Sequence, residues 1–171
     1  MGDLVELRQW RADDAAEVYR ICQDAEIQRW TAVPVPYALQ DATGFVGQPF
    51  GAGDSAHFAV EDRATGALAG SMGVGAFREG VAVVGYWTAP AMRGAGRTAE
   101  ALRLLTAWCF AVRDCARVEL VTEPANVASR AVARRAGFVE EGVLRSRMVL
   151  RGRRIDVVMC SRLPGDPPAE P

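Results

Sequence analysis

The sequence predicts a mixed α+β fold, and three features of the chain indicate it. Strands separated by short turns run from His57 to Thr88, as in an antiparallel meander. The strongest amphipathic helix follows at 97–112, and a hairpin at 138–163 closes the sequence. No internal repeat interrupts this order, so we expect residues 1–163 to form a single domain with a central sheet flanked by helices.

The N-terminal quarter is expected to form one strand and three short helices. Apolar and polar residues alternate from Leu4 to Trp10, which predicts the first strand. Acidic residues at 13 and 14 stand where a helix dipole favours negative charge, and further short helices are predicted at 25–30 and 38–45. The core face of the first helix is expected to contain Ala15, Val18, Tyr19 and Cys22.

The remaining elements alternate between strands and helices. Antiparallel strands are predicted at 57–61, 67–77 and 81–88, followed by the long helix, a strand at 117–122, a helix at 127–136 and a hairpin of 138–150 with 154–163. Prolines and polar residues at 164–171 predict a disordered tail. The core stripe of the long helix is expected to contain Leu102, Leu105, Trp108, Cys109 and Val112.

Composition excludes several classes of function. The chain has 171 residues, of which 50% are apolar and 24% charged, with a net charge of −1. All 20 basic residues are arginines, so a lysine nucleophile, a Schiff base and a phosphate-loop lysine are excluded. A chain near neutrality is a poor nonspecific ligand for nucleic acid. Since there is also no signal peptide and no apolar run of ~18 residues, we expect a cytoplasmic protein without nucleic-acid or membrane partners.

The cysteines and the single histidine predict no metal site. No C-x-x-C spacing occurs, and His57 alone cannot complete a Cys/His cluster. We therefore expect reduced thiols packed in the interior, at Cys22, Cys109, Cys115 and Cys160.

Charge is distributed unevenly along the chain. Residues 1–62 have a balance of −7, so the remainder has a balance of +6. The basic part either faces an anion or forms a solvated arginine-rich surface, and composition alone leaves both interpretations open.

The segment 86–100 carries the most functional information. A strand ends there, a proline-containing loop follows, and Gly94 and Gly96 flank one residue where the long helix begins. Glycines let the backbone approach a ligand closely, and the first N–H groups of a helix have no internal partner, so they can bind an anion. Arg93 and Arg97 add positive charge. A tight turn with exposed arginines is the simpler alternative.

Two known motifs share this pattern. Gly94-x-Gly96-x-x-Ala99 matches a dinucleotide-binding fingerprint, with Glu119 near the distance expected of a ribose-binding acid. However, about five residues separate the preceding strand from Gly94, and the strands before it are antiparallel, so an NAD site is disfavoured. Arg93-x-x-Gly96, preceded by Tyr86-Trp87-Thr88-Ala89-Pro90, resembles instead the coenzyme A pyrophosphate loop of the GNAT superfamily of N-acetyltransferases. Thr98 stands where that family pattern has Gly or Ala.

The resemblance covers residues 4–163. It includes Asn126-x-x-Ser129, Gly137-Phe138 and the segment 137–145, and it is closest to the branch of ribosomal-protein N-terminal alanine acetyltransferases. The implied fold has a mostly antiparallel sheet in which two parallel strands, 81–88 and 117–122, splay to admit acetyl-CoA. The implied activity is direct transfer of an acetyl group to a primary amine, with no metal.

The resemblance also implies roles for individual residues. The backbone of Trp87, Thr88 and Ala89 would hold the pantetheine arm and polarise the thioester carbonyl. The pyrophosphate loop would consist of Arg93, Gly94, Ala95, Gly96, Arg97 and Thr98. Asn126 would contact the cofactor arm, although its position also predicts a helix N-cap. Ser129 would protonate the leaving thiolate, with a first-turn serine of local contacts as the alternative.

Other acid and base positions of this family are apolar here. Val83, Ala133 and Met148 stand where various relatives have Glu, Tyr and Glu. An α-amine with a pKa of ~7.8 costs only ~1 kcal/mol to deprotonate at pH 7, whereas a lysine amine at ~10.4 costs ~4.6 kcal/mol. A site without a strong base therefore favours an α-amine or another amine of low pKa, and the resemblance implies that this amine is a protein N-terminus. Water held by Glu119, by Glu123 or by a backbone carbonyl could assist.

Three questions stay open from the sequence. The acceptor could instead be a small-molecule amine such as an antibiotic or a polyamine, bound by residues 23–53, and a tunnel narrowed at Trp30 would favour it. The apolar residues at the acid and base positions also suit a catalytically silent acyl-CoA-binding module. The acyl group could be longer than acetyl, and a homodimer is one of several assemblies that the sequence allows.

Overall fold

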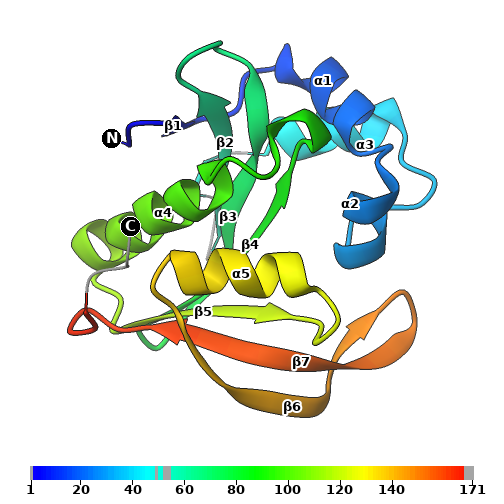
Figure 1. Cartoon of the computed structure of the whole chain (residues 1–171). Helices are drawn as coiled ribbons and strands as arrows, with labels where there is room; N and C mark the ends of the chain where they lie inside the picture. Colours follow the sequence, from blue (N-terminus) through cyan, green and yellow to red (C-terminus); the bar gives the residue numbers. More distant parts are fainter. Residues whose placement is uncertain (1, 49, 52–54, 168–171) are drawn as a thin grey trace.

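Alternating buried and exposed residues build a twisted mixed sheet in the computed structural model, which describes residues 2–48, 50–51 and 55–167. The strand order is β1-β2-β3-β4-β5-β7-β6, and every neighbouring pair is antiparallel except β4 and β5 (Figure 1). The strands are β1 (Val5–Arg8), β2 (Ala56–Asp62), β3 (Leu68–Arg78), β4 (Val81–Thr88), β5 (Arg117–Thr122), β6 (Val139–Leu150) and β7 (Arg153–Arg162).

Helices cover both faces of the sheet. They are α1 (Asp14–Ile21), α2 (Ala25–Trp30), α3 (Leu39–Val46), α4 (Arg97–Arg113) and α5 (Val127–Arg135), with a 3-10 turn at Pro90–Met92. In Figure 1, α4 and α5 lie side by side, while α1, α2 and α3 gather at the other end of the molecule. The β6–β7 hairpin extends along the side opposite α1 and reaches below α2.

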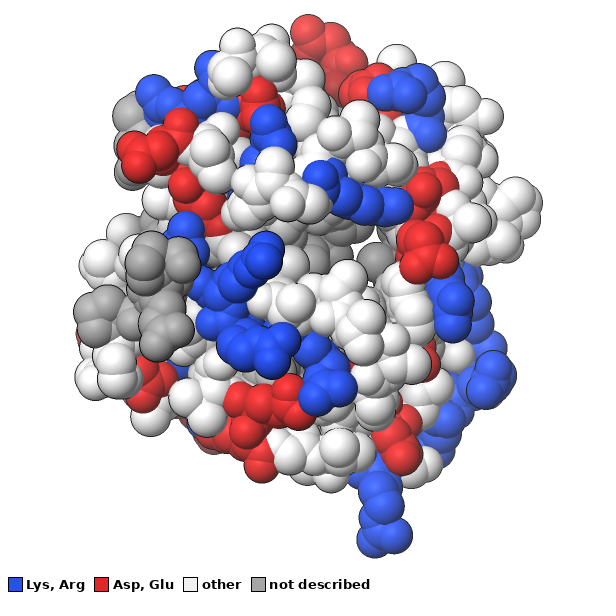
Figure 2. Space-filling view, viewed as in Figure 1, with Lys and Arg blue, Asp and Glu red and all other residues white. Residues whose placement is uncertain are grey.

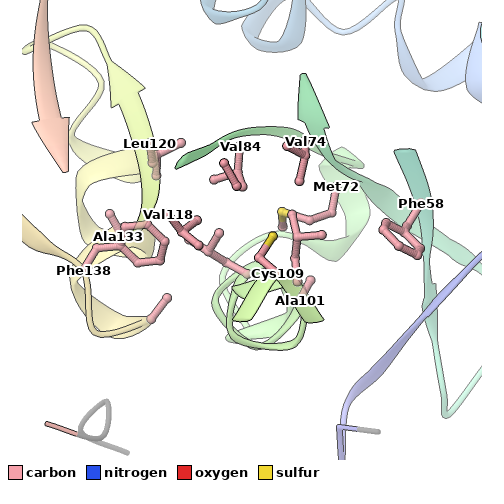
Figure 3. Packing of buried hydrophobic residues seen from close by; sticks show 14 of the residues in the cluster. Phe58, Met72, Val74, Val84, Ala101, Cys109, Val118, Leu120, Ala133 and Phe138 are labelled. Carbon is pink, nitrogen blue, oxygen red and sulfur yellow. The ribbon is translucent and has the colours of Figure 1, made fainter. Parts of the chain in front are cut away.

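Two hydrophobic clusters hold these layers together, one on each face of the sheet. The larger cluster packs Ala101 and Cys109 of α4 and Ala133 of α5 against the sheet (Figure 3). The smaller cluster packs α1 and α3 against Ala59 and Trp87 on the opposite face. Because neighbouring residues of a strand point to opposite faces, β2, β3 and β4 each contribute to both clusters.

The expected elements are all present, with ends shifted by only a few residues, and the expected α+β fold is confirmed. Two core assignments are wrong. Tyr19 is 39% exposed, because the buried face of α1 is formed by Ala15, Val18 and Ile21. Val112 is 63% exposed, because the buried stripe of α4 ends at Cys109, one turn before the helix does.

The tail expected to be disordered begins with a defined turn. The Asp166 carboxylate accepts the N–H of Leu163 at 2.8 Å, and Arg162 donates to the Asp166 carbonyl at 3.3 Å. Residues 168–171 of that predicted tail lie outside the described residues.

Candidate active site

The site begins where the two parallel strands separate. Pairing of β4 with β5 runs only from Val81–Arg117 to Val84–Leu120, although each strand continues beyond that point. The Ala89 N–H donates to the Ala69 carbonyl at 2.9 Å, on the β3 side. The N–H and C=O groups of successive residues in a strand point to opposite edges. The backbone groups of Trp87 therefore also face β3, while those of Tyr86 and Thr88 face the gap.

A cavity of about 600 Å³ occupies this gap. The ends of β4 and β5, the segment before α4, the helix α5 and the helix α2 all contribute to its lining. Figure 2 shows the surface hollowed between the part that carries α2 and the part that carries α5, with basic side chains on the rim. The cavity volume lies within the usual range for small-molecule sites.

The segment before α4 presents backbone donors to one end of the cavity. Gly94 and Gly96 have φ values of +85° and +81°, which glycine adopts without the strain of a side chain. Gly96 is the N-cap of α4, so the N–H groups of Arg97, Thr98 and Ala99 have no partner within the helix. These donors and the helix dipole form a binding site suited to a phosphate group.

The two arginines of this segment are held by carboxylates. The Arg97 guanidinium pairs with Asp62, which is 1% exposed and also accepts the backbone N–H and the hydroxyl of Thr65. Hydrogen bonds from Arg97 and Thr65 keep the pKa of Asp62 below its ordinary value. Arg93 pairs with Asp24 at 2.5 Å. Both guanidiniums therefore already have a carboxylate partner within the chain, which is buried for Arg97.

The departure from the family pattern at Thr98 has a structural explanation. Its hydroxyl lies 2.8 Å from that of Thr88, so the side chain links the first turn of α4 to the end of β4. Two residues later, Glu100 accepts the N–H groups of Leu4 and Val5 at 2.7 and 2.9 Å. These contacts fix the start of α4 relative to the sheet from two directions.

Two predicted polar residues and one that the sequence did not single out meet on the α5 side. Asn126 accepts the N–H of Ser129 at 3.0 Å, which confirms the N-cap, and both residues line the cavity. The Tyr86 hydroxyl lies 2.8 Å from the Ser129 hydroxyl. Burial raises the pKa of Tyr86 to about 12, so the phenol remains protonated at neutral pH. The sequence offered one indication of this role, because Tyr86 lies two residues before Thr88 in the same strand and therefore on the same side of it.

The carboxylates considered as bases separate clearly. Glu119 accepts from Arg117 at 2.7 Å and lies outside the cavity lining, whereas Glu123, at the end of β5, lines the cavity. Three apolar residues stand at acid and base positions of the family. Met148 lines the cavity, Ala133 is buried in the core, and Val83 is part of neither.

The opposite end of the cavity is bordered by α2 and the β6–β7 hairpin. Glu26, Trp30 and Met148 line it, and the Trp30 indole N–H donates to Glu26 at 2.8 Å. Arg151, between β6 and β7, donates to the carbonyls of Gln28, Thr31 and Val33, with distances of 3.2 Å to Thr31 and 3.0 Å to Val33. The hairpin is thereby fastened to the end of α2.

The structure brings most of the predicted site residues together. Two predicted cofactor-binding residues, Ala89 and Ala95, do not line the cavity, and the Ala89 N–H and carbonyl are already bonded to Ala69 and Met92. Those that do line it are Trp87, Thr88, Arg93, Gly94, Gly96, Arg97, Thr98, Asn126 and Ser129.

Other expectations concern the described residues as a whole. No group of three or more His, Cys, Asp or Glu side chains in the described ranges could hold a metal ion. The four cysteines are free and buried, as expected, and burial raises the pKa of Cys22 to about 11. None of the helices seen in the described part of the chain is long and apolar enough to cross a membrane.

Three similarities to known proteins agree with this geometry. YdaF of Bacillus subtilis (strain 168), named provisionally as a ribosomal N-acetyltransferase, is 37% identical over 82 residues, covering 48% of this chain and 45% of YdaF. The chain thus matches less than half the length of this curated relative. Mycobacterium smegmatis RimJ, solved with CoA-disulfide, has a TM-score of 0.82 at 26% identity, covering 94% of this chain and 82% of RimJ.

The third similarity concerns the fold alone. Spermidine N-acetyltransferase from Vibrio cholerae, solved with CoA and spermine, has a TM-score of 0.82 at 18% identity, covering 96% of this chain and 98% of that one. The model of the acetyltransferase (GNAT) domain family matches residues 5–139. Members of this family use acetyl-CoA, and the splayed strands and the glycine loop described above provide a place for it. The chain therefore belongs to the GNAT family of acetyltransferases.

Proposed function

We propose that this protein is a cytoplasmic, acetyl-CoA-dependent N-acetyltransferase that acts on the α-amine of a protein N-terminus. The observation that carries the proposal is the pairing of Ser129 with Tyr86 in a cavity that also contains the glycine loop. One end of that cavity supplies phosphate donors and the other is open to an amine, so both substrates would meet beside two hydroxyl groups.

Acetyl-CoA fits the donors of this chain. The N–H groups at the start of α4 would hold its pyrophosphate, and the outward-facing backbone of Tyr86 and Thr88 would hold its pantetheine arm. Acetyl-CoA supplies the activated acetyl thioester. A backbone N–H aimed at the thioester oxygen is worth about 3 kcal/mol of barrier in comparable sites. Asn126 would contact the cofactor arm through the amide N–H₂ that its capping role leaves unused.

Ser129 would act as the acid, with Tyr86 as its positioning partner. If the phenol donates its hydrogen to the Ser129 oxygen, the serine hydroxyl hydrogen is free to point into the cavity and to reach a leaving thiolate, and the proton that the attacking amine releases to water would restore the serine hydroxyl. The elevated pKa of Tyr86 keeps that donor hydrogen in place across the physiological range.

Deprotonation of the acceptor requires little assistance when the acceptor is an α-amine. Its pKa of ~7.8 leaves a useful neutral fraction at pH 7. Of the two carboxylates considered, Glu123 is the one positioned to accept a proton through water, since Glu119 is bonded to Arg117 outside the cavity.

A small-molecule amine is the second candidate acceptor. Glu26 and Glu123 line the cavity and could bind a cation, and the fold is shared with a polyamine acetyltransferase. Against this, five arginines surround the hairpin at the acceptor end, and a polycation would be repelled by them. A protein N-terminus carries a single positive charge and avoids most of that repulsion.

The test is incubation with acetyl-CoA and amines of each class, with the products measured by mass. Peptides with varied first residues are expected to gain 42 Da at the N-terminus, whereas spermidine, and peptides whose N-terminus is blocked and whose only amine is a lysine, should not react. Acetylation of spermidine alone would assign the small-molecule function. Binding of acetyl-CoA with no transfer to any amine would instead indicate a silent binding module.

The pH dependence of the rate provides an independent check. The reactive form of the amine is the neutral one, so kcat/KM should rise with pH and level off above the α-amine pKa, near 8. Tyr86 should add no inflection below pH 10, because burial raises its pKa to about 12. A rate that keeps rising to pH 10 would point to a lysine-like or polyamine amine.

A further inference from the structure

The arginines of the β6–β7 hairpin differ from the other arginines of the protein. Within 145–154 there are five arginines and no acidic residue. All five are exposed, and none forms an ion pair with any part of the chain that the structure describes. Figure 2 shows basic side chains gathered at the edge of the molecule where the hairpin ends. Asp156, which accepts the Ser146 N–H, is the nearest acidic residue of the hairpin, so this part of a protein with a net charge of −1 is locally basic by about four charges.

A bulge in β6 builds part of this surface. Leu144 pairs with Val157 and Met148 with Ile155, so three residues of β6 face a single residue of β7. The bulge is fixed by the Ser146 N–H, which donates to Asp156 at 2.7 Å, and by Arg154, which donates to the Ser146 carbonyl at 2.9 Å. Bulges redirect side chains locally, and the two side chains beside Ser146 are Arg145 and Arg147.

The basic surface adjoins the acceptor end of the cavity. Met148, which follows the bulge directly, lines the cavity, and Arg151 fastens the hairpin to α2 on the other side of the entrance. A strand advances about 3.3 Å per residue, so the bulge arginines lie within ~10 Å of Met148. Glu26 and Glu123 line the cavity, whereas none of the five hairpin arginines does.

We propose that this hairpin is the docking surface for the acidic residues that follow the N-terminus of a polypeptide acceptor. This inference rests on the proposed function. The positive α-amine would enter past the two carboxylates, while side chains of Asp or Glu at about the third to sixth positions of an extended chain would meet the arginines. The inference thus narrows the acceptor to proteins with an acidic N-terminal segment.

An RNA partner fits the hairpin less well than an acidic peptide. Residues 139–162 contain no Phe, Tyr or Trp, so the hairpin offers no aromatic platform on which bases could stack. On the same two strands, Glu140 and Glu141 pair with Arg130 and Arg117 and place negative charge farther along β6. A basic surface of this limited extent suits a short acidic segment.

The experiment compares two peptides that share their first two residues and carry Asp/Glu or Asn/Gln at positions three to six. The wild-type enzyme is expected to show a kcat/KM about ten-fold higher for the acidic peptide at low salt, shrinking to about two-fold at 0.5 M salt as charges are screened. The variant with Arg145→Ser and Arg147→Ser should lose the preference through KM, while its rate on the neutral peptide is unchanged.

The matched control removes two arginines elsewhere, with Arg20→Ser and Arg78→Ser. Both are exposed and neither lines the cavity, so the preference should persist. A variant with Arg145→Glu and Arg147→Glu should reverse the preference toward a peptide with Lys at positions three to six. This reversal would support the docking surface even if the serine variant were poorly folded.

The outcomes separate the two proposals. Equal kcat/KM for acidic and neutral peptides, or an equal loss of preference in the control, would overturn the docking surface while leaving N-terminal acetylation intact. Binding of an RNA oligonucleotide that requires Arg145 and Arg147, with no competition by the acidic peptide, would also overturn it. If acetyl-CoA binds but neither peptide is acetylated, the failure lies with the proposed function.

Discussion

The two ends of the cavity use arginine in opposite ways. At the cofactor end, Arg93 and Arg97 are each paired with a carboxylate of the same chain. At the acceptor end, the arginines of the hairpin meet only backbone carbonyls or solvent in the described structure. We infer that the arginines paired within the chain fix the backbone for acetyl-CoA, which is the same in every reaction. The unpaired arginines are available to the acceptor, which varies.

This difference determines how each end responds to mutation. The cofactor end works through backbone N–H groups whose positions depend on buried contacts, so substitutions there should alter stability or acetyl-CoA binding whatever the acceptor. The acceptor end works through exposed side chains, so substitutions there should depend on salt and on the peptide. The predictions below test this division from the largest expected effect to the smallest.

Loss of Glu100 should have the largest effect, and it should act on stability. Glu100→Ala removes the acceptor of the buried Val5 N–H and of the partly buried Leu4 N–H, and an unsatisfied buried donor costs about 1–3 kcal/mol. We expect the free energy of unfolding, measured with urea, to fall by about 2–4 kcal/mol. Glu17→Ala, which removes an exposed pair with Arg20, should change it by less than about 0.5 kcal/mol. Similar values for the two variants would contradict the assigned role.

The hydroxyl pair should affect the chemical step without affecting binding. Ser129→Ala is expected to lower kcat by about 100-fold and Tyr86→Phe by about ten-fold, with the Kd of acetyl-CoA within two-fold of wild type. The double variant should be no slower than Ser129→Ala, because Tyr86 acts through the serine. Tyr19→Phe, an exposed tyrosine on α1, is the control. Additive losses in the double variant would show that the phenol acts independently.

The glycine loop should affect binding of acetyl-CoA alone. Gly96→Ala places a Cβ at φ +81°, and relaxation of that strain would turn the Arg97 and Thr98 N–H groups away from the pyrophosphate. We expect the Kd of acetyl-CoA, measured by calorimetry, to rise about ten-fold, or 1.4 kcal/mol. Gly66→Ala carries similar strain at φ +71° in a turn outside the cavity and should leave the Kd unchanged. Equal effects would mean that strain alone weakens the protein.

The cofactor end was predictable from sequence because its components are contiguous. Gly94, Gly96 and Arg97 lie within four residues, and the chemistry comes from backbone geometry that a local motif specifies. The pairing of Arg97 with Asp62 was missed, because a contact across 35 residues depends on how β2 and α4 pack. For the same reason the sequence did not show that the Arg97 guanidinium has a buried carboxylate partner within the chain.

The acceptor end could not be predicted in the same way because it is assembled from distant segments. Trp30 of α2 and Met148 of β6 line one end of the cavity. Arg151 bonds there to the backbone of Val33, more than 110 positions earlier in the sequence. Tyr86 was recognised only as part of a strand, because its partner Ser129 lies on another element. Strands and helices follow from local patterns, whereas such side-chain pairs follow from the packing of the whole sheet.

The smallest expected effect comes from the contact that spans the two ends. Asp24 caps α2 by accepting the N–H of Ile27 at 3.0 Å, and it also pairs with Arg93. Burial alone would raise the pKa of Asp24, but the hydrogen bonds from Arg93 and from the Ile27 N–H outweigh it. The pKa is therefore below its ordinary value, and the carboxylate is charged at neutral pH. If Arg93 must leave Asp24 to reach the pyrophosphate, the two anions compete for one guanidinium.

Asp24→Asn removes the charge and keeps an oxygen that can cap α2. Because an exposed ion pair is worth roughly 0.2–1 kcal/mol, its loss should tighten acetyl-CoA binding by about 1.4- to five-fold at low salt. The effect should vanish when Arg93→Ser is added, and it should shrink at high salt. Unchanged or weaker binding in Asp24→Asn would mean that Arg93 stays with α2 when acetyl-CoA binds, and the cofactor end would then rely on backbone donors alone.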